Sequence, residues 1–335
     1  MRCVIFSTIA PEVELLSSKV GTLDIDCVSQ SVHELRRDAL LRLCKGVRAV
    51  SVGRTDVLNG VTLRVLREAG VEAIVVRHPS LSDMPELDLD AVRSLNIQLC
   101  RIPHVSSAAV AELTIALVLS LFRNVPQAYV RAAGGNLTQA SLIGHELGGK
   151  TCGLLGTGRV GVRVAHALAA LGCKILAYDA FESPHIIELG GEYVSLDELW
   201  ERSDIISLHA PLVEATRHIV NDESIRKLKH GTVLVNTSRG GLMDPAAVLR
   251  GLESGQIGAL GVDVFECDND VFLRDHGVHG VPDKNVSRIL AYPRVLVTPH
   301  LASFTTESLT TVCKGVLTSL EQFERGERID NCSGQ

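Results

Sequence analysis

Several features that mark particular protein classes are scarce in this chain of 335 residues. Aromatic residues make up 4% of it, and positive charge is not in excess, the formal net charge being −6. A negative balance argues against general nucleic-acid binding, so we expect no nucleic-acid partner. The nine cysteines form no C-x-x-C pair, and His276 and His279 have no cysteine or acid at zinc spacing. We therefore expect no metal site.

The cysteines also bear on the cellular compartment. An odd number of cysteines, several of them in apolar segments, is typical of reduced and buried thiols in a cytosolic protein. The amino terminus MRCVIFSTIA has neither the longer apolar core nor the small-residue cleavage site of a signal peptide. We therefore expect a cytoplasmic location.

Long apolar runs are missing as well. The most apolar segment, 108–122, contains Glu112 and is shorter than the ~20 residues that spanning a bilayer requires. It predicts a helix that is buried or lies at a subunit interface, and we expect no membrane partner. With 46% hydrophobic residues, the chain can bury the cores of two domains of ordinary size.

The most informative segment that is present covers residues 150–179, KTCGLLGTGRVGVRVAHALAALGCKILAYD. Its pattern predicts a strand, a glycine turn, a helix and a second strand that ends in an acid. Gly156 permits the tight turn, Gly158 lets the backbone approach a pyrophosphate, and Gly161 lets the helix pack against the strand. The helix N-terminus then offers N–H groups to the phosphates. A lone G-x-G-x-x-G motif is weak evidence, but the complete strand–turn–helix–strand unit with its terminal acid predicts a dinucleotide-binding site.

Asp179 selects between the two nicotinamide dinucleotides. A carboxylate at the end of the second strand can bind the adenosine ribose hydroxyls, whereas it would repel a 2′-phosphate. The next residues, Ala180 and Phe181, offer no compensating arginine. The sequence therefore favours NAD over NADP.

Strand patterns alternate with helical patterns almost throughout, which indicates parallel sheets wrapped by helices. The clearest helical patterns cover 31–43, 60–69 and 245–254. The expected strands before the fingerprint are 2–7, 25–29, 48–52, 71–77 and 97–103, and those after its first strand are 175–179, 204–209, 232–236, 258–263 and 294–298.

The position of the fingerprint in mid-chain predicts how the domains are connected. We expect an α/β protein in which a Rossmann-type, doubly wound parallel-sheet domain is inserted into a smaller flavodoxin-like α/β domain. The NAD-binding domain is expected at 105–298. The discontinuous substrate domain is expected at 1–104 and 299–335. Ligands bind such folds at the carboxyl ends of the strands, where two domains can close over a substrate.

Three polar residues follow expected strand ends: Arg239, Asp268 and His300. A guanidinium can bind a carboxylate through two parallel hydrogen bonds, and a protonated imidazole can give a proton to a carbonyl oxygen. A nearby carboxylate orients the imidazole and favours its charged form. Taken singly, each is more often an ordinary polar loop residue. Their shared position behind a nucleotide fingerprint favours hydride chemistry on a 2-oxo acid.

The sequence resembles the D-isomer-specific 2-hydroxyacid dehydrogenases, and most closely their D-lactate dehydrogenase branch. The resemblance covers nearly the whole chain and rests on GLLGTGRVG, SDIISLHAPL, VNTSRGGLMD, IGALGVDVFE and VLVTPHLA. It implies an NAD-linked oxidoreductase that interconverts 2-oxo acids and D-2-hydroxy acids, is usually a homodimer, and uses Arg239 and His300 as catalytic residues. It also implies cofactor contacts at Arg159, Val160, Asp179, Ala210, Pro211, Thr216, Thr237, Ser238 and Asp263.

The chain departs from the family pattern where the substrate is expected. Asp268 stands in place of the family's orienting Glu, which shortens its reach by roughly 1.5 Å. A short Ala-Gly loop is replaced by a segment that begins Arg77-His78-Pro79, and Pro79 has no N–H to offer a carboxylate. Aromatic residues expected farther along are replaced by Val105 and Ser303. The substrate contacts predicted are Arg77, His78, Val105, Arg239 and Ser303, around a pocket larger than pyruvate needs.

Two alternatives remain at this stage. The transcriptional corepressors related to this family keep the fold and the NAD site, so the chain could be an NAD(H)-sensing binding protein. A dehydrogenase of the hydroxypyruvate or phosphoglycerate type is the other, although the segment 263–275 resembles the D-lactate branch. Turnover of a panel of 2-oxo acids distinguishes the three.

Overall fold

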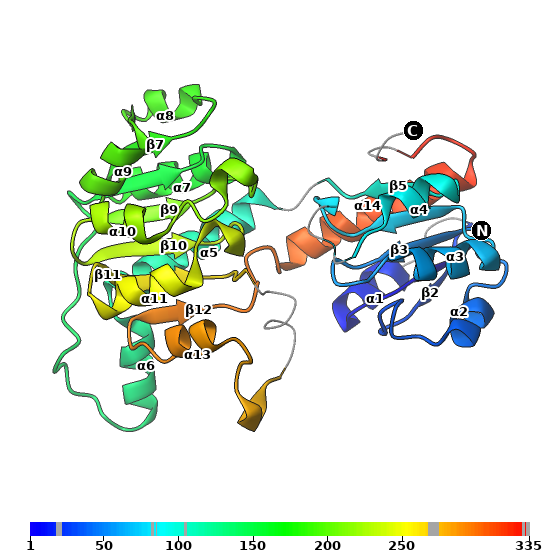
Figure 1. Ribbon diagram of the computed structural model, residues 1–335, viewed down its shortest axis with the longest axis horizontal. Helices are drawn as coiled ribbons and strands as arrows, with labels where there is room; N and C mark the ends of the chain where they lie inside the picture. Colours follow the sequence, from blue (N-terminus) through cyan, green and yellow to red (C-terminus); the bar gives the residue numbers. More distant parts are fainter. Residues whose placement is uncertain are drawn as a thin grey trace. The chain divides into compact units, whose positions relative to one another are not determined.

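Two parallel sheets, each covered by helices on both faces, make up the computed structural model (Figure 1). The structure describes residues 1–17, 22–81, 84, 86–103, 106–266, 275–329 and 332. The chain divides into two units, Met1–Ser106 with Thr305–Gln335, and Ser107–Phe304.

The first unit has a five-stranded parallel sheet in the order β2-β1-β3-β4-β5, which is the flavodoxin-like order. Its strands are β1 (Arg2–Ile5), β2 (Asp24–Cys27), β3 (Ala49–Val52), β4 (Ala73–Val76) and β5 (Gln98–Arg101). Its helices are α1 (Ala10–Ser17), α2 (Arg37–Leu43), α3 (Gly60–Ala69), α4 (Leu89–Ser94) and α14 (Thr306–Glu324).

Alternate residues of these strands enter opposite cores, as the two-residue period of a strand requires. Val4 and Val50 pack with α2, α3 and α4 on one face. Cys3 and Ile5 pack with α1 and α14 on the other. β3 and β4, in the middle of the sheet, are therefore buried at every position and read as nearly continuous apolar runs.

The second unit has a seven-stranded parallel sheet in the order β12-β11-β10-β9-β6-β7-β8. Its strands are β6 (Thr151–Leu155), β7 (Lys174–Tyr178), β8 (Glu192–Tyr193), β9 (Ile205–Leu208), β10 (Thr232–Asn236), β11 (Ile257–Val262) and β12 (Val295–Val297). Its helices are α5 (Ser107–Phe122), α6 (Val125–Ala133), α7 (Arg159–Ala170), α8 (Pro184–Glu188), α9 (Leu196–Arg202), α10 (Asp222–Lys227), α11 (Pro245–Glu253) and α13 (Lys284–Leu290). Short 3-10 turns are η2 (Glu214–Thr216), η3 (Gly240–Leu242) and η4 (Gly277–His279).

The order of strands in the second sheet reverses between β6 and β9, which is the topological switch point of a Rossmann fold. The expected fold class, a doubly wound Rossmann-type sheet inserted into a flavodoxin-like unit, is confirmed. The chain returns to the first unit at Thr305 and not at the expected residue 299. His300 stays with the second unit because its backbone N–H donates to the carbonyl oxygens of Asp263 and Thr298.

The structure differs from the expected elements in two further places. The helix expected over 31–43 begins only at Arg37, because 31–34 form a turn in which Ser31 N donates to Glu34 and Glu34 N donates back to the Ser31 carbonyl. The edge strand β8 was not expected. It has two residues, too few for an alternating pattern.

The expectation that all cysteines are reduced is wrong for two of them. Cys100, in β5, and Cys332 form a disulfide within the first unit, and the two residues also make an isolated antiparallel bridge. They are separated by 232 residues in sequence. Six other cysteines in the described part of the chain are free, and most of those are buried.

The described residues contain no single helix long and apolar enough to cross a membrane. The pair α5 and α6 passes that test jointly by length and composition, but it is bent by 69°. Leu117 and Val118 of α5 are buried against α7 and the sheet, as expected of a core helix.

Candidate active site

The glycine loop between β6 and α7 has the geometry that a bound pyrophosphate requires. Gly156 has φ of +100°, and a Cβ there would lie 2.6 Å from the backbone nitrogen of Ala210. A Cβ on Gly161 would lie 2.1 Å from the carbonyl oxygen of Gly156. A Cβ on Gly158, by contrast, would meet nothing within 4 Å. Two glycines therefore permit close packing, and the third borders open space into which a phosphate fits.

The N-terminus of α7 faces this loop without a protein cap. Gly158 is the N-cap residue and supplies no side-chain acceptor, so the first N–H groups of α7 are left for another partner. Arg159 and Val160 form its first turn. The exposed Arg159 side chain makes no ion pair with any described residue. These residues fit the phosphates of a dinucleotide.

Asp179 follows β7 directly and contacts the glycine loop. Its Oδ2 accepts hydrogen bonds from the backbone N–H of Thr157 at 2.6 Å and from the Thr157 hydroxyl at 3.2 Å. Its Oδ1 accepts from the backbone N–H of Phe181 at 3.1 Å. The carboxylate therefore lies beside the glycine loop at the carboxyl end of β7, and its contact with an adenosine ribose stays a prediction.

The loop after β9 is held by its own side chains. The Thr216 hydroxyl donates to the carbonyl oxygen of Pro211 at 2.6 Å and accepts from the Val213 N–H at 2.9 Å. The carbonyl oxygen of Ala210 accepts from the Ser238 hydroxyl at 2.8 Å. Three of the residues expected to contact the cofactor, Ala210, Pro211 and Thr216, thus shape this loop. At its start, burial lowers the pKa of His209 to about 4.

Arg239 is presented by a tight turn after β10. The Asn236 side chain accepts from Ser238 N at 3.0 Å and donates to the carbonyl oxygen of Arg239 at 3.0 Å. Thr237 is buried, and its hydroxyl lies 2.7 Å from that of Thr114 on α5. We did not expect Asn236 to matter. The signal was in the sequence, because an Asn at a strand end that is followed by Thr-Ser commonly forms such a turn.

Asp263, after β11, anchors the turn that carries His300. Its Oδ1 accepts from the Thr298 hydroxyl at 2.5 Å and from Leu301 N at 2.7 Å, and its Oδ2 accepts from Ala302 N at 2.9 Å. His300 has φ of +55°, a conformation that residues with a side chain rarely adopt. Burial raises the pKa of Asp263, while these hydrogen bonds and the charge of His300 oppose that rise. The aspartate thus holds the turn and interacts with the imidazole.

The three strands that carry these groups are neighbours. Arg239 follows β10, Asp263 follows β11 and His300 follows β12, and β11 lies between the other two. Because the strands are parallel, their carboxyl ends lie on one edge of the sheet. The glycine loop follows β6 on that same edge.

Arg77 has a different environment from the one expected of a substrate contact. It is 9% exposed, and its guanidinium donates to Glu12 at 3.2 Å and to the carbonyl oxygens of Phe6 and Ser7 at 2.6 Å and 3.0 Å. Both charged side chains of the pair are buried. This network, within the first unit, gives Arg77 a structural role, so we no longer count it among the substrate contacts. Sequence reasoning missed Glu12, which is 65 residues away.

Two of the four remaining expected site residues lie in the described part of the chain. Asp268 and Val105 lie outside the described residues. The ring of His78 lies 2.9 Å from the carbonyl oxygen of Ser80. Ser303 is partly exposed and is followed by Phe304, which is 53% exposed.

Glu266, the described acid two residues before Asp268, has partners within the second unit. Its carboxylate forms an ion pair with Arg217, and its Oε2 lies 2.9 Å from the Nε2 of His218. Among the described residues, no group of three His, Cys, Asp or Glu side chains is arranged to hold a metal ion.

This edge of the second sheet defines a class of protein, the nicotinamide-dependent oxidoreductases. Residues 115–302 match the model of the D-isomer specific 2-hydroxyacid dehydrogenase NAD binding domain. The chain belongs to this family, and it is an NAD-dependent D-2-hydroxyacid dehydrogenase.

The similarity to known members of the family extends over most of the chain. D-lactate dehydrogenase kk1H of Curvularia clavata is 40% identical over 84% of this chain and 80% of its own length. An aromatic 2-oxoacid reductase of Clostridium sporogenes is 34% identical over 85% and 86%. The solved structure of the pyruvate reductase of Chlamydomonas reinhardtii superposes with a TM-score of 0.91 and 36% identity, covering 99% of this chain and 98% of the other.

Proposed function

We propose that the enzyme reduces a 2-oxo acid whose side chain is larger than the methyl group of pyruvate. The observation that carries the chemistry is the row of Arg239, Asp263 and His300 at the ends of three adjacent strands. The Arg239 guanidinium binds the substrate carboxylate and polarises the ketone. The hydride for C2 would come from NADH held by the glycine loop and Asp179.

His300 supplies the proton to the carbonyl oxygen during reduction and removes it during oxidation. Its orientation is set by the backbone of the turn, whose three consecutive amides donate to Asp263. Asp268 remains our proposal for the carboxylate that orients the imidazole. The cofactor contacts predicted at the glycine loop, at Asp179 and in the loops after β9 and β10 are likewise proposed for NAD.

The size of the substrate follows from residues at positions where the family has aromatic side chains or hydrogen-bond donors. Pro79 offers no N–H, and its carbonyl oxygen accepts from Arg101 at 2.7 Å. The Arg77 guanidinium donates its hydrogen bonds to Glu12 and to backbone carbonyl oxygens. Ser303 replaces an aromatic side chain. A small substrate loses hydrogen bonds worth ~0.5–1.5 kcal/mol each, whereas a larger one offsets that loss by burying apolar surface at ~25 cal/mol per Å².

A panel of 2-oxo acids tests the proposal. We expect kcat/KM to be higher for phenylpyruvate or a branched 2-oxo acid than for pyruvate. Ser303→Tyr should lower kcat/KM for phenylpyruvate more than for pyruvate, while Ser287→Tyr, on the exposed surface of α13, should change neither. A clear preference for pyruvate in the unmodified enzyme contradicts the larger substrate. Tight NADH binding without turnover of any 2-oxo acid contradicts the catalytic roles.

For the units, we propose that residues 1–106 and 305–335 form the substrate domain and that 107–304 form the NAD domain. For the assembly, we propose a homodimer and neither a nucleic-acid nor a membrane partner. The support for a dimer is a group of exposed apolar side chains on and after α6, namely Val125, Tyr129, Val130, Leu137 and Ile143. Light scattering on the purified enzyme measures the mass, and a monomer contradicts the dimer.

We also propose a cytoplasmic location, supported by the six free cysteines of the described chain. The Cys100–Cys332 disulfide argues the other way, because cytosolic thiols are mostly kept reduced. Cell fractionation combined with trapping of free thiols decides between the two.

A further inference from the structure

A pocket lies at the end of the Rossmann sheet where its strands begin, opposite the end that carries the glycine loop. Its volume is about 340 Å³, roughly ten times the share of one water molecule in the liquid. The residues lining it precede or begin the strands: Lys150 before β6, Asp204 before β9, Thr232 at the start of β10, Gly258 in β11 and Arg294 before β12. None of them belongs to the proposed catalytic or NAD-binding set.

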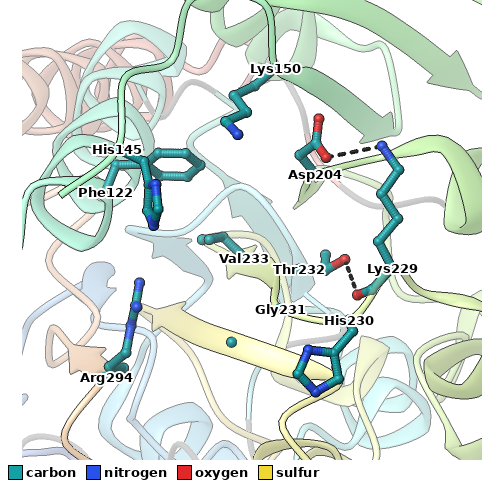
Figure 2. Close-up of a pocket in the computed structure, with 11 residues that line it drawn as sticks. Phe122, His145, Lys150, Asp204, Lys229, His230, Gly231, Thr232, Val233 and Arg294 are labelled. Atoms are coloured by element: carbon teal, nitrogen blue, oxygen red, sulfur yellow. Dashed lines mark hydrogen bonds and ion pairs between the residues drawn. The ribbon is translucent and has the colours of Figure 1, made fainter. Parts of the chain in front are cut away.

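The lining is strongly basic in a chain whose net charge is −6. Asp204 is its one acid, and its basic side chains are Lys150, Lys229, Arg294, His145 and His230. In Figure 2, Arg294 points toward the ring of His145, and Lys150 points into the space between Phe122 and Asp204. The basic side chains come from three segments that are far apart in sequence, and in Figure 2 Lys229 is directed toward Asp204.

Asp204 neutralises only part of this charge. Its Oδ1 pairs with Lys229 at 2.9 Å, and its Oδ2 accepts from the backbone N–H of Thr151 at 2.8 Å. Burial alone raises the pKa of Asp204, but these bonds and the charges of Lys229 and Lys150 hold it below its ordinary value. Lys150 and Arg294 form no hydrogen bond or ion pair through their side chains with any residue that the structure describes.

The backbone and the apolar residues of the lining complete the pocket. The backbone N–H of His145 donates to the carbonyl oxygen of Phe122 at 2.9 Å, which fixes the histidine beside the end of α5. A Cβ on Gly231 would meet nothing within 4 Å. Phe122 and Val233 add an apolar part to the lining. The space thus offers cations to an anionic group and apolar surface to an attached organic part.

We propose that this pocket binds the phosphoryl group of a small anionic ligand. Ammonium groups are compact donors to phosphate, and a guanidinium adds directed donors. Several cations around one space suit a multiply charged tetrahedral anion better than a single carboxylate. The shared chemistry is a phosphate, which arrives either as the free ion or on a phosphorylated small molecule.

Cations in this place also have a structural use. Lys229 follows the C-terminus of α10, where positive charge complements the helix dipole. A purely structural role predicts that replacing these side chains lowers Tm in the absence of ligand. The proposed site predicts in addition that phosphate raises Tm and that this rise depends on the basic side chains.

The experiment measures thermal unfolding and calorimetric binding on the full-length enzyme saturated with NADH, so that phosphate does not compete for the glycine loop. The probes are inorganic phosphate and glycerol 2-phosphate, with acetate and with chloride at matched ionic strength. The test variant is Lys150→Gln with Arg294→Gln. The control is Lys284→Gln with Lys314→Gln, which removes the same charge from two exposed sites elsewhere.

We expect both phosphates to raise Tm and to bind, while acetate and chloride do not. The test variant should lose about tenfold or more in phosphate affinity, and the control should keep it. Tighter binding of glycerol 2-phosphate identifies a phosphorylated small molecule as the natural class, and equal binding identifies the free ion.

Equal stabilisation by chloride, or phosphate binding that is unchanged in the test variant, overturns the proposal. The proposal is also overturned if phosphate has no effect on the parent enzyme while the test variant has a lowered Tm. In that case the cations have a structural role alone. If the variant with Lys150 changed does not fold, Arg294→Gln alone is compared with Lys284→Gln alone, since both side chains are exposed and each change removes one charge. Catalytic turnover enters none of these measurements, so the proposed substrate is tested separately.

Discussion

The backbone N–H of His300 donates to the carbonyl oxygen of Asp263 at 3.1 Å, and the next two amides donate to the Asp263 carboxylate. One aspartate thus fixes three consecutive residues of the turn. Because His300 has φ of +55°, the turn is held in a conformation that it would rarely adopt alone. Asp263 was expected to contact the cofactor, and its contacts within the protein add a positioning role.

Removing the Asp263 carboxylate should disturb both stability and turnover. In Asp263→Ala the amides of Leu301 and Ala302 lose their acceptor, so we expect a loss of about 2–4 kcal/mol in the free energy of unfolding. We also expect kcat to fall at least tenfold, because His300 loses its fixed backbone. The matched control is Asp283→Ala, which also removes a carboxylate bonded to two amides, at the start of α13. It should lose about 1 kcal/mol and keep kcat. Equal kcat in both variants contradicts the positioning role.

Arg239 and His300 should separate kinetically. His300→Gln should leave NADH binding intact, as followed by fluorescence, and lower kcat by ~10²–10⁴-fold, the usual contribution of general acid–base catalysis. Arg239→Lys keeps the charge but loses the bidentate fork, so it should raise KM and also lower kcat. Full turnover by His300→Gln on the best substrate would falsify the proposed proton transfer.

Asp179 should determine the cofactor preference. The unmodified enzyme should prefer NADH strongly over NADPH, and Asp179→Ala combined with Ala180→Arg should shift the ratio of kcat/KM values toward NADPH. Glu182→Ala removes an exposed carboxylate nearby and should leave the ratio unchanged. Equal use of both cofactors by the parent enzyme shows that Asp179 does not meet the ribose.

His209 should contribute to the pH dependence of stability. Its pKa is lowered to about 4 in the folded protein, so the unfolded chain binds its proton first as pH falls below 6.5. The contribution of His209 is therefore constant above pH ~7 and is lost between pH ~6.5 and ~4. The full shift corresponds to ~3 kcal/mol, and we expect about 1–2 kcal/mol because the residue remains partly exposed. Urea unfolding at pH 7 and pH 4.5 should show a smaller loss in His209→Gln. An identical loss in both proteins contradicts this.

The Cys100–Cys332 disulfide should be visible chemically. Denatured enzyme should titrate two fewer thiols before reduction than after it. Cys332→Ser should abolish that difference and lower the free energy of unfolding by about 2–4 kcal/mol, since the bond closes a long loop. Cys27→Ser, at a free cysteine, should leave the difference at two. Equal thiol counts before and after reduction contradict the bond.

Local chemistry explains what could be predicted from the sequence. Gly156 and Gly161 are required by close contacts with neighbouring backbone, so the glycine loop is encoded in consecutive residues. Apolar strands buried on both faces are recognisable as continuous runs, and their alternation with helices determined the fold class.

Features that depend on distant partners could not be predicted. Arg77 was expected in the substrate pocket because its sequence neighbourhood does not reveal Glu12, with which it is buried. The pairing of Cys100 with Cys332 depends on the C-terminal segment returning beside β5. The anchoring of the His300 turn requires β11 and β12 to be adjacent, which only the sheet order provides.

The split of the first unit between both ends of the chain has a consequence for biosynthesis. All five strands of its sheet have been synthesised by Arg101, but Leu320 and Phe323, which cover one face of that sheet, belong to the final helix. The whole Rossmann unit leaves the ribosome in between and can fold first. A nascent chain must therefore carry this sheet face with only α1 to cover it until α14 has been synthesised, so the unit that is begun first is completed after the Rossmann unit.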